Sequence, residues 1–151
     1  MRRIWSGLLA GAAGTSALNM VTYLDMAGRA RPASSTPQRS VGRLAETLHV
    51  DLGDDETASN RRDGLGPLLG YATGLGAGAL YAVAGPRRAP VWAATGLLAM
   101  LAMAGSDAPM TLLKVTDPRQ WSAADWASDI VPHLAYGLVA AAVLHRLRAR
   151  D

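Results

Sequence analysis

Long apolar segments separated by short charged ones set the pattern of this chain. Residues 4–24 and 65–85 contain no charged side chain, residues 89–113 are interrupted by Asp107 alone, and residues 130–144 are interrupted by His133 alone. A helix rises about 1.5 Å per residue, so about 20 apolar residues span a hydrocarbon layer of about 30 Å. The pattern therefore predicts four membrane-spanning helices, over about 4–24, 65–85, 89–113 and 128–147.

The expected fold is all-α: residues 1–151 form a single membrane domain, a polytopic bundle of four transmembrane helices. A soluble bundle is disfavoured because residues 65–85 offer only Tyr71, Thr73 and Tyr81 as polar positions, too few for a solvated helix face. The start of the chain is also typical of a secretory signal, but its apolar run exceeds the usual length of about 7–15 residues. Three more spans follow, which favours a retained first helix.

Arginines predict the orientation of the bundle. Those at the start of the chain, between the second and third spans, and at the end of the chain share one side of the membrane: Arg2, Arg3, Arg87, Arg88, Arg146, Arg148 and Arg150. Because cationic loops stay inside, both termini are expected in the cytoplasm, with residues 28–63 and 114–127 outside. The six arginines within 28–63 argue against that placement, although longer loops obey the rule less strictly.

Glycine recurs at every fourth position of the second span, at Gly66, Gly70, Gly74 and Gly78. Small residues at this spacing let two helix backbones approach closely, so the second span is expected at the centre of the bundle. Its partner is either another span of the same chain or a second copy. A composition rich in Ala and Gly also produces such spacings by accident.

Two short motifs recur in the same order along the chain. Residues 7–10 (Gly-Leu-Leu-Ala) return at 96–99, and residues 67–71 (Pro-Leu-Leu-Gly-Tyr) are echoed at 132–136 (Pro-His-Leu-Ala-Tyr). Duplication of a two-span unit would give two repeated helical hairpins that insert the same way round. Coincidence in a low-complexity sequence is the alternative.

The extramembrane loop 28–63 is expected to hold a short amphipathic helix. Residues 34–38 combine capping Ser and Thr residues with Pro37 for the first turn, and Val41, Leu44 and Leu48 follow at helical spacing. Such a helix lies either on the membrane surface or against the mouth of the bundle. The acidic residues of 51–56 lack the alternating ligands of a calcium loop and predict a solvated turn.

Two features mark the start of the last span. Ser122 and Asp125, three residues apart, predict a capping box, which gives Asp125 a structural role. Trp121 and Trp126 flank this start, as tryptophans at a membrane interface commonly do.

Polar side chains within the spans are the candidates for function. A charged Asp at mid-helix costs roughly 2.5–3.5 kcal/mol on insertion, so Asp107 is expected to face the interior and to be partnered, protonated or hydrated. The candidate cluster toward the outer leaflet comprises Asn19, Asp25, Asp107, Asp129 and His133. These groups either pair to fix the bundle, or form a proton relay or small-cation site.

Composition narrows the chemistry. The chain has no Cys, which excludes disulfides and thiolate zinc ligands. It also lacks a Gly-rich phosphate loop, a paired-His metal motif and a nucleophile elbow. The net charge of +3 reflects arginines at helix ends rather than a nucleic-acid patch. We therefore expect no enzyme, cofactor, metal site or nucleic-acid partner, and expect the lipid bilayer and a homo-oligomer or another membrane protein as partners.

Several short motifs resemble those of YagU-like bacterial inner-membrane proteins. They comprise residues 7–11 (Gly-Leu-Leu-Ala-Gly), 106–110 (Ser-Asp-Ala-Pro-Met), 116–118 (Thr-Asp-Pro), Trp121, Asp129, His133-Leu134 and the basic residues 146–150. The match covers mainly the first, third and last spans, while the loop 28–63 has no counterpart and Pro132 stands where that family tends to carry Gly. The resemblance implies a multi-pass protein of the bacterial plasma membrane without an established reaction.

These patterns favour a structural or accessory membrane component assembled through glycine-faced helices. The alternative function is a small permease, or a proton or cation pathway, that uses Asp107 and His133.

The four-span topology predicts the sidedness of cysteine labelling in this Cys-free chain. Ser59→Cys should react with an impermeant maleimide added outside intact cells, whereas Ala149→Cys should react only after the cells are opened. Labelling of both positions from outside would contradict the four-span arrangement.

Overall fold

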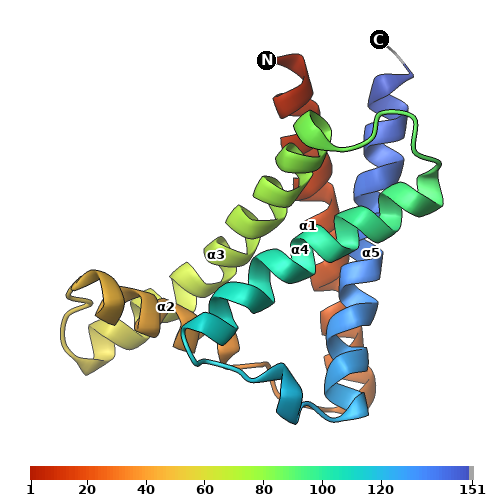
Figure 1. Ribbon diagram of the computed structural model, residues 1–151. Coiled ribbons are helices and arrows are strands. Elements are labelled where there is room, and N and C mark those ends of the chain that lie inside the picture. The colour runs from red at the N-terminus through yellow and green to blue at the C-terminus, as the bar shows by residue number, and fades with distance from the viewer. Residues whose placement is uncertain (150–151) are drawn as a thin grey trace.

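A computed structural model describes residues 1–149, whose regular secondary structure consists of helices joined by short turns and loops (Figure 1). The five α-helices and one short 3-10 turn follow in the order α1 (Arg2–Arg29), α2 (Thr36–Leu48), α3 (Asp55–Ala84), α4 (Val91–Leu112), η1 (Pro118–Gln120) and α5 (Ala123–Arg148). The all-α expectation is confirmed, as is a helix within the first loop. Three of the long helices, α3, α4 and α5, are long and apolar enough to cross a membrane.

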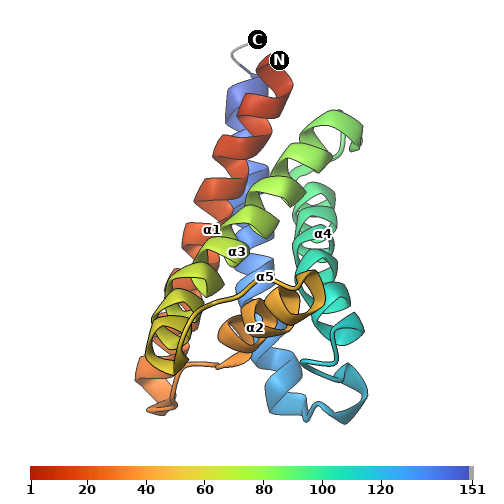
Figure 2. The same cartoon turned by 90° about the vertical axis from the view of Figure 1, so that its left-hand side faces the viewer.

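The bundle is organised around α1 and α5. These two helices run side by side, α3 packs on α1, and α4 packs on α5, whereas α3 and α4 share a much smaller contact (Figures 1 and 2). The two termini lie at one end of the bundle together with the α3–α4 loop, and the α4–α5 loop lies at the other end (Figure 1). The expectation that the second span is central is corrected, because α1 contacts both α3 and α5.

α1 packs closely on both α3 and α5, and its buried face consists of small residues only: Gly7, Ala10, Gly11, Gly14 and Thr15. A helix without bulk on this face can approach two neighbours at once. Small residues serve this purpose in membrane bundles, where lipid tails remove any hydrophobic drive between helices.

Helix α3 begins well before the uncharged stretch that predicted it. Asp54 is the N-cap, and its side chain accepts a hydrogen bond from the Thr57 amide at 2.8 Å. Asp55 and Glu56 follow in the first turn, where carboxylates favour the positive end of the helix dipole. The acidic residues of the loop 28–63 thus start a helix, and the loop ends at Asp54 rather than at residue 63.

Helix α2 packs against the N-terminal part of α3. Its buried residues are Ser40, Val41 and Ala45, whereas Leu44 and Leu48 are exposed. The expected apolar stripe therefore shares only Val41 with the buried face. Ser35 is the N-cap but makes no side-chain capping bond, so it does not cap this helix through its side chain as expected.

The glycines of α1 and α3 bring these two backbones into direct contact. A Cβ added to Gly11 would lie 2.5 Å from the Gly74 carbonyl oxygen, and one added to Gly7 would lie 2.6 Å from the Gly78 carbonyl oxygen. The remaining two glycines of the α3 series differ, because Gly66 faces Pro37 of the α2 start and Gly70 faces open space. Each four-residue step turns the direction by about 40°, so the four glycines cannot all face one helix.

Tyr136 joins three helices at the middle of the bundle. This α5 side chain is fully buried, and its hydroxyl donates a hydrogen bond of 2.6 Å to the Gly74 carbonyl on α3. The ring passes α1 at Gly14, where an added Cβ would lie 2.7 Å from a ring carbon. One residue on, a Cβ at Gly137 would meet Ala99 of α4 at 3.0 Å. Glycine thus permits every close contact in this region.

The distribution of side-chain size is inverted relative to that of a soluble bundle. Alanines dominate the core around Leu98, Tyr136 and Leu144, whereas many large apolar side chains point outward, among them Leu9, Leu68, Leu80, Trp92, Met100, Leu134 and Leu138. Soluble monomers rarely expose so much contiguous apolar surface.

The duplication of helical hairpins is not confirmed by the packing. Gly7 lies against the α3 backbone, whereas its counterpart Gly96 has no atom within 4 Å of an added Cβ. Tyr136 is fully buried, whereas its counterpart Tyr71 is only half-buried. Equivalent positions of the two motifs therefore have different surroundings.

The α1–α3 contact predicts unequal effects of enlarging neighbouring glycines. Gly74→Leu should reduce the free energy of unfolding by about 1–3 kcal/mol or more, because the new Cβ would collide with the Thr15 side chain. Gly76→Leu, at a position facing open space, should change it by less than about 0.5–1 kcal/mol. The neighbouring variant Ala77→Leu would not serve as a control, because Ala77 is 7% exposed and belongs to the core. Equal effects in detergent unfolding would contradict the packing described.

Candidate functional site

The facing sides of α4 and α5 carry a polar cluster formed by Asp107, Asp129 and His133. Asp107 lies on α4 and interacts electrostatically with Asp129 and His133 of α5. The Ser106 hydroxyl donates to Oδ1 of Asp107 at 3.3 Å and to the Met103 carbonyl at 2.9 Å. Three of the residues expected from the sequence therefore lie together, at the end of the bundle opposite the termini.

His133 is held by the turn of α5 that precedes it. Its Nδ1 lies 2.8 Å from the Asp129 backbone oxygen and 3.3 Å from Oδ1 of the Asp129 carboxylate. Since a carbonyl oxygen only accepts, Nδ1 carries the proton in this geometry. The ring is 11% exposed and the Asp129 side chain 20% exposed, so the pair is largely shielded.

One oxygen of this cluster has no partner. Oδ2 of Asp129 is buried and forms no hydrogen bond within the described residues 1–149. A buried acceptor without a donor is costly, which distinguishes this oxygen from the other polar atoms of the cluster. No group of three or more potential ligands within residues 1–149 is arranged to hold a metal ion.

The cluster is closed toward the middle of the bundle. His133 stands one helical turn from Gly137 and three residues before Tyr136, which is fully buried. Beyond them the interior is filled by the alanines and leucines of the core. The polar groups therefore form a local site near one end of α4 and α5.

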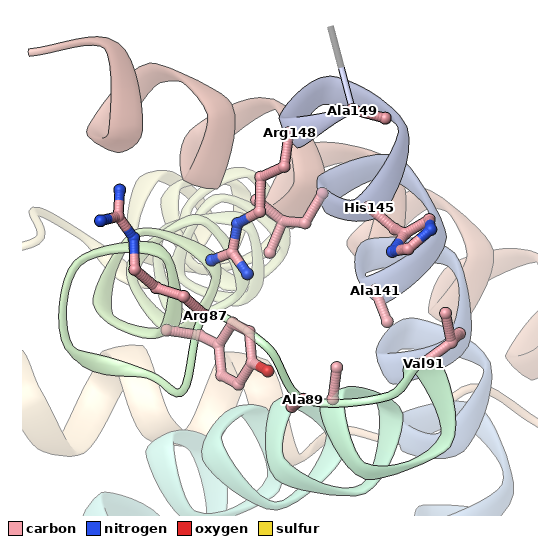
Figure 3. Close-up of a pocket in the computed structure, with 10 residues that line it drawn as sticks. Arg87, Ala89, Val91, Ala141, His145, Arg148 and Ala149 are labelled. Atoms are coloured by element: carbon pink, nitrogen blue, oxygen red, sulfur yellow. The ribbon is translucent and has the colours of Figure 1, made fainter. Parts of the chain in front are cut away.

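A second feature lies at the end of the bundle that carries the termini. A pocket of about 240 Å³ lies between the α3–α4 loop and the last turns of α5. Figure 3 shows His145 and Arg148 flanking it from α5, Arg87 approaching from the loop, and Ala89 and Val91 beneath. No carboxylate is among the described residues that line it.

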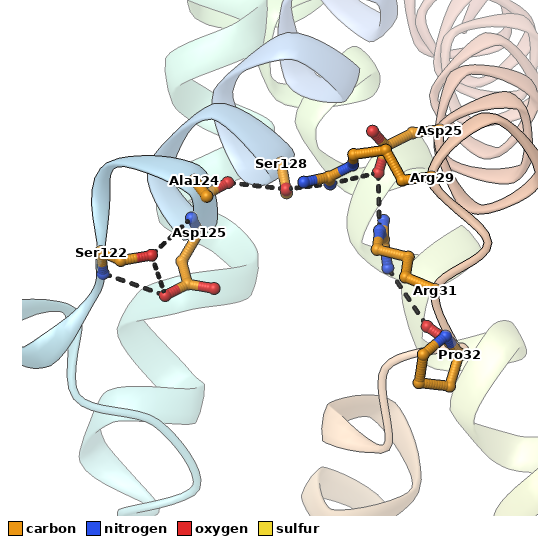
Figure 4. A network of polar contacts seen from close by, with 8 residues as sticks. All are labelled: Asp25, Arg29, Arg31, Pro32, Ser122, Ala124, Asp125 and Ser128. Carbon is orange, nitrogen blue, oxygen red and sulfur yellow. Dashed lines mark hydrogen bonds and ion pairs between the residues drawn. The ribbon is translucent and has the colours of Figure 1, made fainter.

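Asp25 belongs to a separate network that joins the end of α1 to the start of α5 (Figure 4). Oδ2 of Asp25 accepts from Arg29 at 2.5 Å and from Arg31 at 2.6 Å, and Arg29 also donates to the Ser128 hydroxyl at 2.6 Å. Asp25 lies just beyond the uncharged stretch 4–24, and hydrogen bonds from the two arginines lower the pKa of its carboxyl. The structure therefore does not bring Asp25 to the Asp107 cluster.

The remaining expected residues have simpler surroundings. Asn19 is half-buried on α1, and none of the side-chain hydrogen bonds in residues 1–149 involves it. Ser122 and Asp125 form the predicted capping box at the start of α5, with Oδ2 of Asp125 accepting from the Ser122 amide at 2.9 Å. Trp121 and Trp126 pack edge to face, with ring centroids 4.9 Å apart.

Sequence reasoning did not single out Tyr136 or the pocket at the termini. A tyrosine inside an apolar span is a detectable signal, because its hydroxyl needs an acceptor when buried. The pocket gave no comparable signal, since its arginines were explained by membrane orientation alone. Only the fold brings Arg87 to Arg148.

No protein-family model, curated protein or solved structure matches this chain.

The Asp25 network predicts pH-dependent stability. Because the pKa of Asp25 is lowered in the fold, the ion pairs stabilise the protein above the ordinary value of 3.8 and this contribution is lost as the pH falls through the lowered pKa. Asp25→Asn should therefore lower the melting temperature in detergent at neutral pH, and the difference from the parent should shrink below about pH 4. Asp63→Asn, which removes an exposed carboxylate, is the control. A difference that persists unchanged in acid would contradict the ion-pair explanation.

Proposed function

We propose that this chain is a multi-pass protein of the bacterial plasma membrane, with α1, α3, α4 and α5 as four spans and both termini in the cytoplasm. The observation that carries the proposal is the inverted packing, with alanine and glycine inside and large apolar side chains outside. Lipid is the environment that suits such a surface. The N-terminus lies at the same end of the bundle as the α3–α4 loop with Arg87 and the end of α5 with Arg148, which supports the orientation.

The first span is the part of this proposal that needs its own argument. α1 has 28 residues and packs between α3 and α5, two helices that are apolar enough to cross a membrane. Its exposed apolar residues include Leu9, Met20 and Leu24. A helix so placed accompanies its neighbours through the bilayer, in agreement with the resemblance to YagU-like proteins.

Within this setting we infer a structural or accessory role. A closed, alanine-filled interior suits a component that holds its shape rather than one that conducts a solute. Several glycines of the spans meet no other part of the described chain, among them Gly70 and Gly76 of α3 and Gly96 of α4. Such positions suit contact with a second copy or with another membrane protein.

This role predicts an assembly that depends on an outward glycine. The purified protein should have the mass of more than one chain, and Gly70→Leu should shift it toward a single chain by blocking close approach. Ala72→Leu adds a similar side chain on a different exposed face of α3 and should leave the mass unchanged. A single-chain mass for the parent protein, measured by light scattering after detergent correction, would contradict self-assembly.

A second candidate function is a proton or small-cation pathway, and the unpartnered Oδ2 of Asp129 favours it. Two carboxylates and an imidazole in one shielded group can exchange a proton among themselves. Water that enters from the nearer end of α4 and α5 would supply this proton.

The two candidates make different predictions for Asp107→Asn. For a pathway, the variant should remain folded yet lose proton or cation flux in liposomes at least about tenfold, because an amide does not take up a proton. For a structural group, the parent should show no flux, and the variant should melt at a lower temperature because an interaction with His133 is lost. Flux that is equal in both proteins would exclude Asp107 from any pathway.

A further inference from the structure

The pocket at the end that holds the termini combines two kinds of surface. Arg87 and Arg148 bring guanidinium groups to it from different elements, and His145 adds an imidazole (Figure 3). The opposite part of the lining is apolar, with Ala89, Val91, Ala94, Ala141 and Leu144.

One guanidinium group of the pocket is held in position, and within residues 1–149 neither of the two forms an ion pair. The Arg148 guanidinium lies 5.8 Å from the ring centroid of Tyr81, a side chain that is 2% exposed and therefore fixed in the core. Neither Arg87 nor Arg148 takes part in an ion pair with a carboxylate of the described residues. The pocket thus offers charge-assisted donors to an anion without losing an existing partner.

The apolar part of the pocket lining restricts the chemical class of the anion that fits there. A free phosphate would bind the guanidinium groups and leave Val91 and Leu144 facing water. A phosphodiester with attached acyl chains would instead cover these side chains, because its glycerol and first methylenes lie beside the head group. Trp92 follows Val91 in the chain, and its ring is exposed. Because tryptophans favour the membrane interface, this ring is consistent with a pocket at the level of the lipid head groups.

We propose that this pocket binds the phosphate group of an anionic phospholipid from the cytoplasmic leaflet. The inference rests on the orientation proposed above, in which this end of the bundle faces the cytoplasm. Basic pockets between spans at that level are suited to anionic head groups, and lipid bound there ties the α3–α4 loop to the end of α5.

The test is native mass spectrometry of the full-length protein in a non-ionic detergent, with phosphatidylglycerol, phosphatidylcholine or inorganic phosphate added. Phosphatidylglycerol should bind at low stoichiometry and phosphatidylcholine much more weakly. Arg87→Gln combined with Arg148→Gln should weaken phosphatidylglycerol binding by roughly tenfold or more. Arg3→Gln combined with Arg146→Gln removes the same charge at the same end, outside the pocket, and should leave binding nearly unchanged.

A second variant guards against loss of folding in the first. Ala89→Glu keeps both arginines, places a carboxylate in the pocket lining at a partly exposed position, and should also abolish binding. Equal weakening by the pocket pair and the control pair would overturn the proposal in favour of general charge attraction. Displacement of the lipid by equimolar inorganic phosphate would overturn it in favour of a free-anion site. Binding in detergent micelles does not depend on membrane orientation. A failure to bind lipid would therefore leave the proposed orientation untouched, since labelling at residues 59 and 149 tests the orientation separately.

Discussion

The structure depends on close backbone contact between α1 and its two neighbours at the level of Tyr136. In a bilayer, as proposed for this chain, helices associate without a hydrophobic drive, so their attraction comes from contact area and from interhelical hydrogen bonds. Gly14 leaves room for the Tyr136 ring, and Gly11 and Gly74 let α1 and α3 touch. The Tyr136 hydroxyl then donates a hydrogen bond directly to the Gly74 carbonyl, which fixes α5 relative to α3.

The sequence predicted the helical elements well because their signals are local. Uncharged length located the helices, and Ser122 with Asp125 located the start of α5. The start of α3 was missed because charged residues were assigned to a loop, although Asp54 and the acidic first turn favour a helix N-terminus. Which helix is central was not predictable from spacing, since the choice depends on pairs such as Gly11 and Gly74 that only three-dimensional packing defines.

The candidate polar site was predictable in part for the same reason. Asp129 and His133 share one helix, so their proximity follows from a four-residue spacing. The position of Asp107 followed from the connection between the last two spans. Asp25 was assigned to this group by depth alone, and its ion pairs with Arg29 and Arg31 place it elsewhere. Within residues 1–149 the bundle thus carries a shielded acidic group at one end and a basic pocket without a carboxylate in its lining at the other, with an alanine-rich core between them.

The most direct measurement of this packing is disulfide trapping in membranes, which is feasible because the chain has no cysteine. A Cβ at Gly74 would lie 3.3 Å from the Thr15 Cβ, close to the separation of about 3.5–4.5 Å in disulfides. Oxidation of a Thr15→Cys, Gly74→Cys variant should therefore form a bond within one chain, detected after cleavage of the α1–α3 loop. Thr15→Cys with Gly70→Cys, where Gly70 faces open space, should not. Equal trapping of both pairs, or trapping only between copies, would contradict the α1–α3 contact.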